Sequence, residues 1–286
     1  MLGGSIWREQ GGATCYPPGM QSDICRLRAI CACWRMAVRK SKVTEAPAAL
    51  PAQRALVPLS ARVFGMAIHV FTAIGAAAGL MGLAAAVQGR FPAMFFWLAV
   101  ALLIDGIDGT FARLARINET APRYDGAVLD LVVDYLTYVV VPVVGLWRSG
   151  LLPEDLGLGL GVLVMVSSSL YFADREMKMQ DHYFRGFPAL WNVIALYLFV
   201  FDLPAWLNAS IIVIFCALMF APVPFLHPLR VVRLRALSVA FTCLWFGSAA
   251  LAVTEGLNNI DVFAKVGLIA SALYFLLAPL LARRAM

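Results

Sequence analysis

Four aspartates that lie in or beside long apolar runs are the residues best able to carry chemistry. Asp105 and Asp108 belong to one run, and Asp130 and Asp134 belong to the next. An ionisable side chain at membrane depth costs about 2.5–3.5 kcal/mol on insertion scales, so such a residue is a functional candidate by default. Carboxylate oxygens suit Mg2+ or Mn2+, which also supply the counter-charge that converging acids need. The four acids therefore indicate a site for divalent cations.

The first pair of acids shares a helix face with small residues and a guanidinium. At 100° per residue, Asp105 and Asp108 are i, i+3 neighbours, and Ala112 falls between them in azimuth. Gly109 and Arg113 continue the same side. The small residues remove side-chain bulk, so a flat ligand such as a nucleotide base can approach the backbone. Arg113 can bind a phosphate with a bidentate fork.

The next run carries a second stripe on one helix face. It consists of residues spaced by four, namely Gly126, Asp130 and Asp134. Two antiparallel helices joined across the gap 114–125 can place all four acids around one site. Two divalent cations about 3.5–4 Å apart would clamp a phosphate there and stabilise the charge that develops in phosphoryl transfer. The two stripes together predict a metal-centred phosphate site.

Two other interpretations leave features of the acids unexplained. Helix-end charges paired with Arg113, Arg116 and Arg123 would explain acids near an interface, but not their helical register with glycines on both runs. A proton relay or ion pathway, as in an ion-coupled membrane carrier, also uses chains of acids. Its pointer in a sequence is interrupted helices in two matching halves, whereas this chain has one acid cluster and no visible repeat.

The composition is that of a chain whose solvent is a lipid bilayer. Of 286 residues, 62% are hydrophobic and 14% are charged, against about 25% charged residues in a soluble domain. We expect an all-α integral membrane protein with one membrane-embedded catalytic domain over residues 54–286, opened by a short surface-lying segment at 54–63. Residues 1–53 lack periodicity, and we expect them to be disordered or part of an overlong gene model. About eight transmembrane helices are predicted from the apolar runs at 64–87, 93–112, 126–147, 156–173, 187–203, 206–226, 236–254 and 262–282.

The basic residues orient these runs across the membrane. With the N-terminus in the cytoplasm, 20 of the 23 Lys and Arg residues fall on the cytoplasmic side, and only Arg90, Arg148 and Lys265 fall on the other. This is a positive-inside pattern, and it places both aspartate stripes near cytoplasmic helix ends. The net charge of +6 then reports membrane orientation and contact with anionic lipid, so no nucleic-acid partner is expected.

The two stripes resemble the signature of the CDP-alcohol phosphatidyltransferase family. The gap between them has twelve residues where the family usually has eight, and about eight spans replace the common six. In both departures the sequence is similar to the bacterial phosphatidylcholine synthases within that family. The stretches 171–174, 186–192 and 225–230 also resemble this branch, and the resemblance covers about residues 58–284. The eight matching signature positions are Asp105, Asp108, Gly109, Ala112, Arg113, Gly126, Asp130 and Asp134.

The resemblance implies an activity that the residues alone do not supply, in which CDP-diacylglycerol and choline give phosphatidylcholine and CMP. It implies Mn2+ or Mg2+ held by the four aspartates, with Asp134 as the general base that takes the choline hydroxyl proton. It also implies a family-like helical core in the bacterial inner membrane, an active site that faces the cytoplasm, and a homodimer. The residues expected at the cytidine diphosphate part are Asp105, Gly109, Ala112, Arg113 and Gly126.

The long gap adds Asp125 directly before Gly126. This carboxylate is either an extra ligand or a helix cap. Thr120 and Pro122 nearby mark a helix start, and they favour the cap.

Choline carries a permanent positive charge, which proteins recognise with aromatic faces and often a carboxylate. Near cytoplasmic span ends, Tyr171, Asp174 and Trp191 are the preferred choline residues, and Tyr138 is a further candidate. Tyr and Trp also gather at membrane interfaces without any ligand, so this alternative stays open for each of them.

Other basic groups leave further choices open. His227, Arg230 and Arg233 follow the sixth run, where they could bind the substrate pyrophosphate or anionic lipid headgroups. His69 lies in the first run without metal-like spacing, and we expect it to be structural.

The nearest alternative to choline is another acceptor, such as serine, inositol phosphate or glycerol phosphate. A phosphorylated acceptor would need extra basic residues beside the site, and Arg175, Lys178 and Arg185 could provide them.

Overall fold

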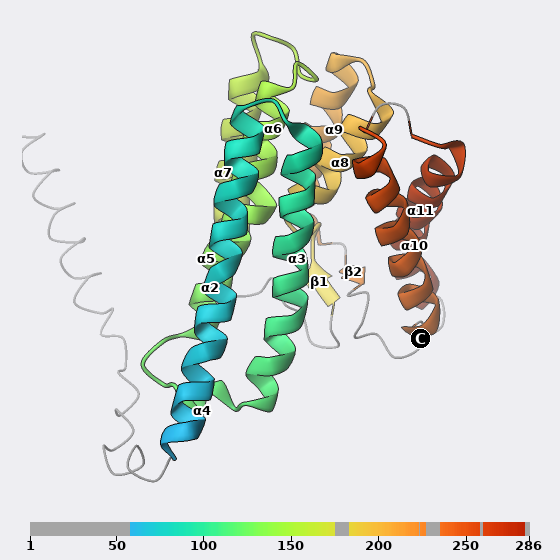
Figure 1. Cartoon of the computed structure of the whole chain (residues 1–286). Helices are drawn as coiled ribbons and strands as arrows, with labels where there is room; N and C mark the ends of the chain where they lie inside the picture. The colour runs from blue at the N-terminus through green and yellow to red at the C-terminus, as the bar shows by residue number, and fades with distance from the viewer. Residues whose placement is uncertain (1–57, 175–182, 223, 227–234, 258–259, 284–286) are drawn as a thin grey trace, which may run out of the picture. The chain divides into compact units, whose positions relative to one another are not determined.

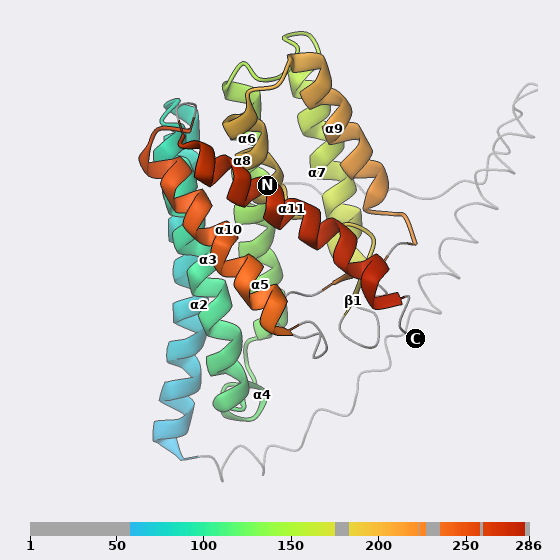
Figure 2. The same cartoon turned by 90° about the vertical axis from the view of Figure 1, so that its right-hand side faces the viewer.

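The structure is a computed structural model, and it describes residues 58–174, 183–222, 224–226, 235–257 and 260–283. The extension predicted at 1–53 lies outside these residues, as do His227, Arg230 and Arg233. Figures 1 and 2 show the fold in two views at right angles.

Helices dominate the chain, and one of them contains a π-helical stretch. The elements in chain order are α2 (Leu59–Val87), α3 (Phe91–Leu114), α4 (Ile117–Thr120), α5 (Gly126–Asp134), the π-helix η2 (Tyr135–Val140), α6 (Val141–Arg148), α7 (Gly157–Ala173), β1 (Tyr183–Arg185), α8 (Trp191–Phe201), α9 (Ala205–Leu218), β2 (Pro224–Leu226), α10 (Arg235–Thr254) and α11 (Val262–Arg283).

The predicted all-α membrane class is confirmed. Four helices of the described part are long and apolar enough to cross a bilayer: Leu59–Val87, Phe91–Leu114, the continuous Gly126–Arg148 and Arg235–Thr254. Four shorter apolar helices occupy the places of the remaining predicted runs, at Gly157–Ala173, Trp191–Phe201, Ala205–Leu218 and Val262–Ala278. The number of spans itself stays a prediction.

Helix α2 runs beside α3 and packs against α5, η2 and α6 (Figure 1). Its contact face is made of small residues: a Cβ at Gly75 would meet Val133, and one at Gly79 would meet Leu136. Small residues allow helix backbones to approach closely where lipid offers no hydrophobic drive for association. These small residues therefore fix α5 against α2.

Three boundaries differ from the sequence prediction, each near a proline. Helix α2 already begins at Leu59 after Pro58, so the part of the expected surface-lying segment that the structure describes belongs to the first long helix. Helix α8 begins only at Trp191, after Pro188, and α9 ends at Leu218, ahead of a proline-containing stretch. Proline lacks the N–H that a helix interior requires, which explains why α8 begins later and α9 ends earlier than predicted.

A short antiparallel pairing of β1 with β2 was not predicted from the sequence, and it places Phe184 opposite Phe225. Gly186 follows β1 with φ +77°, a left-handed conformation. A Cβ there would collide with the carbonyl of Met219 at the end of α9, and the next residue, Phe187, donates its N–H to Leu218 O at 3.0 Å. Glycine thus ties the strand pair to the end of α9.

The buried core lies around η2, α6 and α8, where Val139, Leu146 and Trp191 are almost fully enclosed. Large apolar side chains such as Phe64, Phe96 and Phe263 stay exposed on the outer surface. Exposed apolar side chains on long apolar helices are the expected surface for contact with lipid tails.

Candidate active site

Three of the four signature aspartates meet where α3 lies near α5. Oxygen atoms of Asp105, Asp108 and Asp130 all lie within 4.8 Å of one another. Asp108 is buried, and the other two are partly buried. Octahedral ligands at about 2.1 Å from Mg2+ lie about 3.0–4.2 Å apart, so small side-chain rotations would bring three oxygens onto one ion. The structure thus supports the prediction that these acids can hold a metal ion.

Asp134 lies one turn beyond Asp130 at the last residue of α5. In the described part of the chain it is not a member of the 4.8 Å group. It lies four residues after Asp130 and four residues before Tyr138 in one continuous helical segment. The hydroxyl of Tyr138 donates a hydrogen bond of 2.6 Å to Asp105 Oδ2. Tyr138 therefore links η2 to the acid cluster.

The π-helix η2 begins directly after Asp134. π-helical turns in membrane and soluble helices often occur at functional sites. Pro142 has no N–H for the carbonyl of Tyr138, four residues earlier, so the ordinary i→i−4 pattern is interrupted here. The wider turn carries the side chain of Tyr138 to Asp105 on α3.

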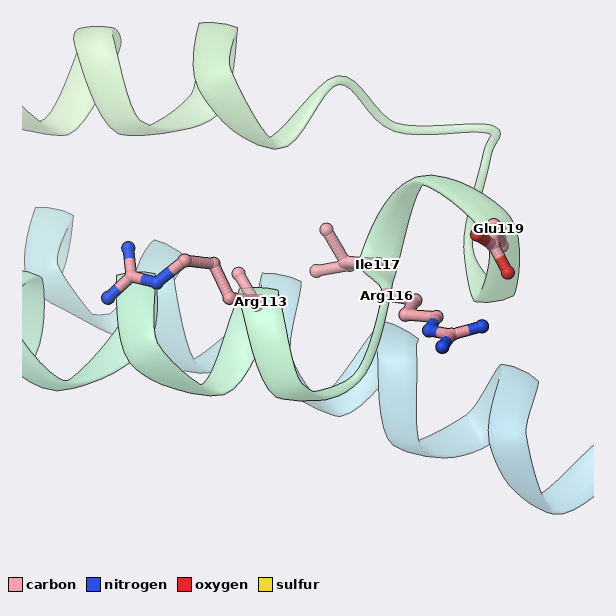
Figure 3. Close-up of a pocket in the computed structure, with 5 residues that line it drawn as sticks. Arg113, Arg116, Ile117 and Glu119 are labelled. Atoms are coloured by element: carbon pink, nitrogen blue, oxygen red, sulfur yellow. The ribbon is translucent and has the colours of Figure 1, made fainter.

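The arginine of the signature lies at the end of α3. Arg113 donates from Nη2 to Thr110 Oγ1 at 3.2 Å, and its guanidinium passes close to Gly109. An open hollow of about 410 Å3 adjoins it. Figure 3 shows the side chain of Arg113 running back along α3, away from Arg116 and Glu119. The hollow is lined by Ala112, Arg113, Arg116, Ile117 and Glu119.

The twelve-residue gap is an ordered turn between the two stripes. Arg116 adopts a left-handed φ of 46° and starts the one-turn helix α4. Thr120 then donates its hydroxyl to Ala115 O at 3.3 Å. Asp125 accepts hydrogen bonds from Ala127 N at 3.0 Å and Val128 N at 3.2 Å. The predicted capping role of Asp125 is confirmed, and this cap fixes the first turn of α5.

Comparison with known proteins decides the family. No protein-family model matches the chain. It is 39% identical over 227 residues to a phosphatidylcholine synthase of Pseudomonas aeruginosa, which covers 79% of this chain and 94% of that protein. It is 36% identical over 219 residues to one of Mesorhizobium japonicum, or 72% and 82% of the two chains. A relative from Bradyrhizobium diazoefficiens is 47% identical over 184 residues, or 64% and 69%.

The chain belongs to the phosphatidylcholine synthase family. It is therefore an enzyme of phospholipid biosynthesis, and the predicted family resemblance is confirmed. This assignment gives the acid cluster a context, because Asp105, Asp108 and Asp130 are three of the positions at which the sequence resembles the CDP-alcohol phosphatidyltransferase signature.

The structure places only two of the three residues predicted to bind choline, Tyr171 and Asp174, at one helix end. Tyr171 is 4% exposed near the end of α7, and its hydroxyl has no hydrogen-bond partner among the described residues, whereas Asp174 directly after this helix is exposed. Trp191 is 0% exposed, and its Nε1 donates to Ser168 Oγ at 2.9 Å. Trp191 thus has a packing role in the described core, and its contact with a ligand stays a prediction.

Two residues beside the acids were missed by sequence reasoning as parts of the metal and nucleotide site. Thr72 on α2 lies beside the carboxylate of Asp108, and the hydroxyl of Tyr138 donates a hydrogen bond to Asp105. A hydroxyl in an apolar helix is common, and the sequence does not show which helix it will face. The only available signal for Tyr138 was its spacing of four residues from Asp134.

Proposed function

We propose that this enzyme transfers the phosphatidyl group of CDP-diacylglycerol to choline, with release of CMP. The observation that carries the proposal is the three-aspartate cluster at signature positions in a chain of the phosphatidylcholine synthase family. The relatives are named for making phosphatidylcholine. The cluster supplies the metal site that a phosphoryl transfer to an alcohol requires.

Asp105, Asp108 and Asp130 would hold Mn2+ or Mg2+ through carboxylate oxygens, which are the ligands that such hard cations prefer. A metal ion held there would supply positive charge to balance the diphosphate and Lewis acidity at its phosphate oxygens. Arg113, at the edge of the open hollow, is the residue we assign to a phosphate oxygen. Gly109 and Ala112 keep the neighbouring backbone of α3 accessible to the cytidine part. At Gly126 the ring of His69 takes the space of a side chain, so a nucleotide contact of Gly126 stays a prediction.

Asp134 is the residue we assign as general base. It lies one turn beyond Asp130 on the same helix, which places a carboxylate that can accept a proton beside the metal ligands. Asp134 takes the proton of the choline hydroxyl, and the choline oxygen forms a bond to the phosphorus that carries diacylglycerol. The bond from that phosphorus to the oxygen of CMP breaks, and CMP leaves with the electron pair.

For choline, we propose a site at the end of α7 between Tyr171 and the carboxylate of Asp174. Ser168 lies one turn before Tyr171 on α7. The fully buried Trp191 donates a hydrogen bond to Ser168, and we propose that this bond positions α7 at the choline site. His227, Arg230 and Arg233 stay predicted contacts for phosphate or for lipid headgroups.

We further propose that the enzyme lies in the bacterial inner membrane with its active site toward the cytoplasm, as a homodimer. The distribution of basic residues supports this orientation. The relatives with the same name come from bacteria.

The proposal is tested with the purified full-length protein in lipid nanodiscs. Labelled choline should enter phosphatidylcholine only when CDP-diacylglycerol and Mn2+ are both present, and chelation with EDTA should stop the reaction. Unlabelled choline should compete, whereas serine, inositol phosphate and glycerol phosphate should not. Incorporation of one of those acceptors in place of choline would overturn the acceptor assignment.

Two aspartate variants test the roles of the acids. Asp130→Asn should lower activity at least about 100-fold and weaken stabilisation by Mn2+, because it removes a charged ligand. Asp134→Asn should lower activity by about 100- to 10,000-fold while it retains Mn2+ binding, because it removes only the base. Asp125→Asn is the matched control, because this acid caps α5, and it should retain activity. Wild-type turnover by Asp134→Asn would remove that residue from the role of base.

A further inference from the structure

His69 on α2 is a buried polar residue that the proposed reaction does not use. Its side chain is 5% exposed, and Nε2 has no hydrogen-bond partner among the residues that the structure describes. An unsatisfied buried polar atom costs about 1–3 kcal/mol. Such an atom within a membrane helix is a functional candidate, because the bilayer offers it no water.

The ring of His69 lies beside the first turn of α5. A Cβ on Gly126 would lie 3.2 Å from Cε1 and 3.7 Å from Nδ1 of His69. The ring of Tyr124 lies on the same side, with its centroid 5.8 Å away. The absence of a side chain at Gly126 therefore makes room for an imidazole, and the Cε1–Nδ1 edge packs against α5 while Nε2 stays unpartnered.

The position of His69 along α2 brings it next to the acid cluster. Thr72, one turn further along the same buried face, lies beside the carboxylate of Asp108. His69 thus lies between the level of Asp108 and the signature position Gly126. It is not a metal ligand in the described cluster, which contains aspartates only. A donor to an oxygen of the substrate is the role that remains for Nε2.

We propose that His69 contacts the nucleotide part of the lipid donor, with Nε2–H donating a hydrogen bond to an oxygen of the cytidine diphosphate group. This inference rests on the proposed function, because it takes CDP-diacylglycerol as the substrate. A neutral imidazole can donate from Nε2, and a phosphate oxygen is a strong acceptor for such a donor. The proposal gives His69 a binding role, where the sequence suggested a structural one.

The test compares His69→Leu with His69→Gln in the full-length protein in nanodiscs. Leucine fills the volume without a donor, whereas the glutamine amide can present an N–H at a similar distance from the backbone. His69→Leu should raise the Kd for CMP and the KM for CDP-diacylglycerol about tenfold or more, and leave the KM for choline within about twofold. His69→Gln should recover most of the affinity for CMP, measured by calorimetry.

Ile68→Ala is the control for packing, since Ile68 is a buried neighbour on the same helix with 5% exposure. It should lower the melting temperature and leave CMP affinity unchanged. Equal CMP affinity in His69→Leu and the wild type would overturn the role of His69 alone. An equal loss in Ile68→Ala would overturn it too, because the effect would then be one of packing. A wild-type protein that binds neither CMP nor CDP-diacylglycerol would overturn the proposed function as well.

Discussion

At the scale of single residues, the hydroxyl of Tyr138 helps to hold the signature acids. It donates a hydrogen bond of 2.6 Å from η2 to Asp105 Oδ2. This bond stabilises the charge of Asp105 beside the other carboxylates and fixes the direction of its oxygen. Residues that orient metal ligands in this way often affect metal affinity or activity by about 10- to 100-fold.

Tyr138→Phe should therefore raise the Mn2+ concentration for half-maximal activity by about 10- to 100-fold, and should weaken the stabilisation by Mn2+ in thermal unfolding. Its phenylalanine ring retains the packing of Tyr138, so the melting temperature without metal should change little. Tyr135→Phe is the matched control, because this tyrosine also lies on η2 but donates to Met165 O at 3.0 Å. The same dependence on Mn2+ in both variants would refute a specific role for Tyr138.

At the scale of elements, the sequence predicted the eight apolar helical segments and the pairing of the two aspartate stripes. Periodicity and composition carry that information, because a helix in lipid must satisfy its backbone internally. The π-helix was missed, since a period of 3.6 residues was assumed through Tyr135–Val140. Pro142 was the available signal. The positions of Thr72 and His69 opposite the acids could not be predicted, because they depend on the rotation of α2.

The turn at Gly186 determines how the strand pair joins α9, and it offers a stability test. Gly186→Ala should destabilise the protein by roughly 2–5 kcal/mol, because a left-handed alanine is strained and its Cβ collides with the backbone at Met219. Gly150→Ala is the matched control: φ is 76°, but nothing lies within 4 Å of the new Cβ. It should cost about 1–2 kcal/mol. Thermal unfolding that gives equal losses for both variants would contradict the collision.

At the scale of the whole molecule, the long apolar helices and the exposed apolar surface make this a membrane enzyme. The acid cluster lies toward the helix ends that are joined by the gap 114–125, so the orientation of that gap decides which compartment supplies choline. The count of basic residues predicts that this end faces the cytoplasm. The membrane topology of this protein therefore determines from which side choline reaches the active site.

Labelling of single introduced cysteines determines this topology. The background is an active variant in which the six native cysteines have been replaced. Arg123 lies in the gap before α5, Glu154 lies in the loop between α6 and α7, and both are exposed. Because one long helical segment, Gly126–Arg148, separates them, they should face opposite sides of the membrane. A membrane-impermeant maleimide should label Glu154→Cys in intact Gram-negative cells, and Arg123→Cys only after the inner membrane is opened. The reverse pattern would place the active site on the periplasmic side, and labelling of both positions in intact cells would contradict a membrane span between them.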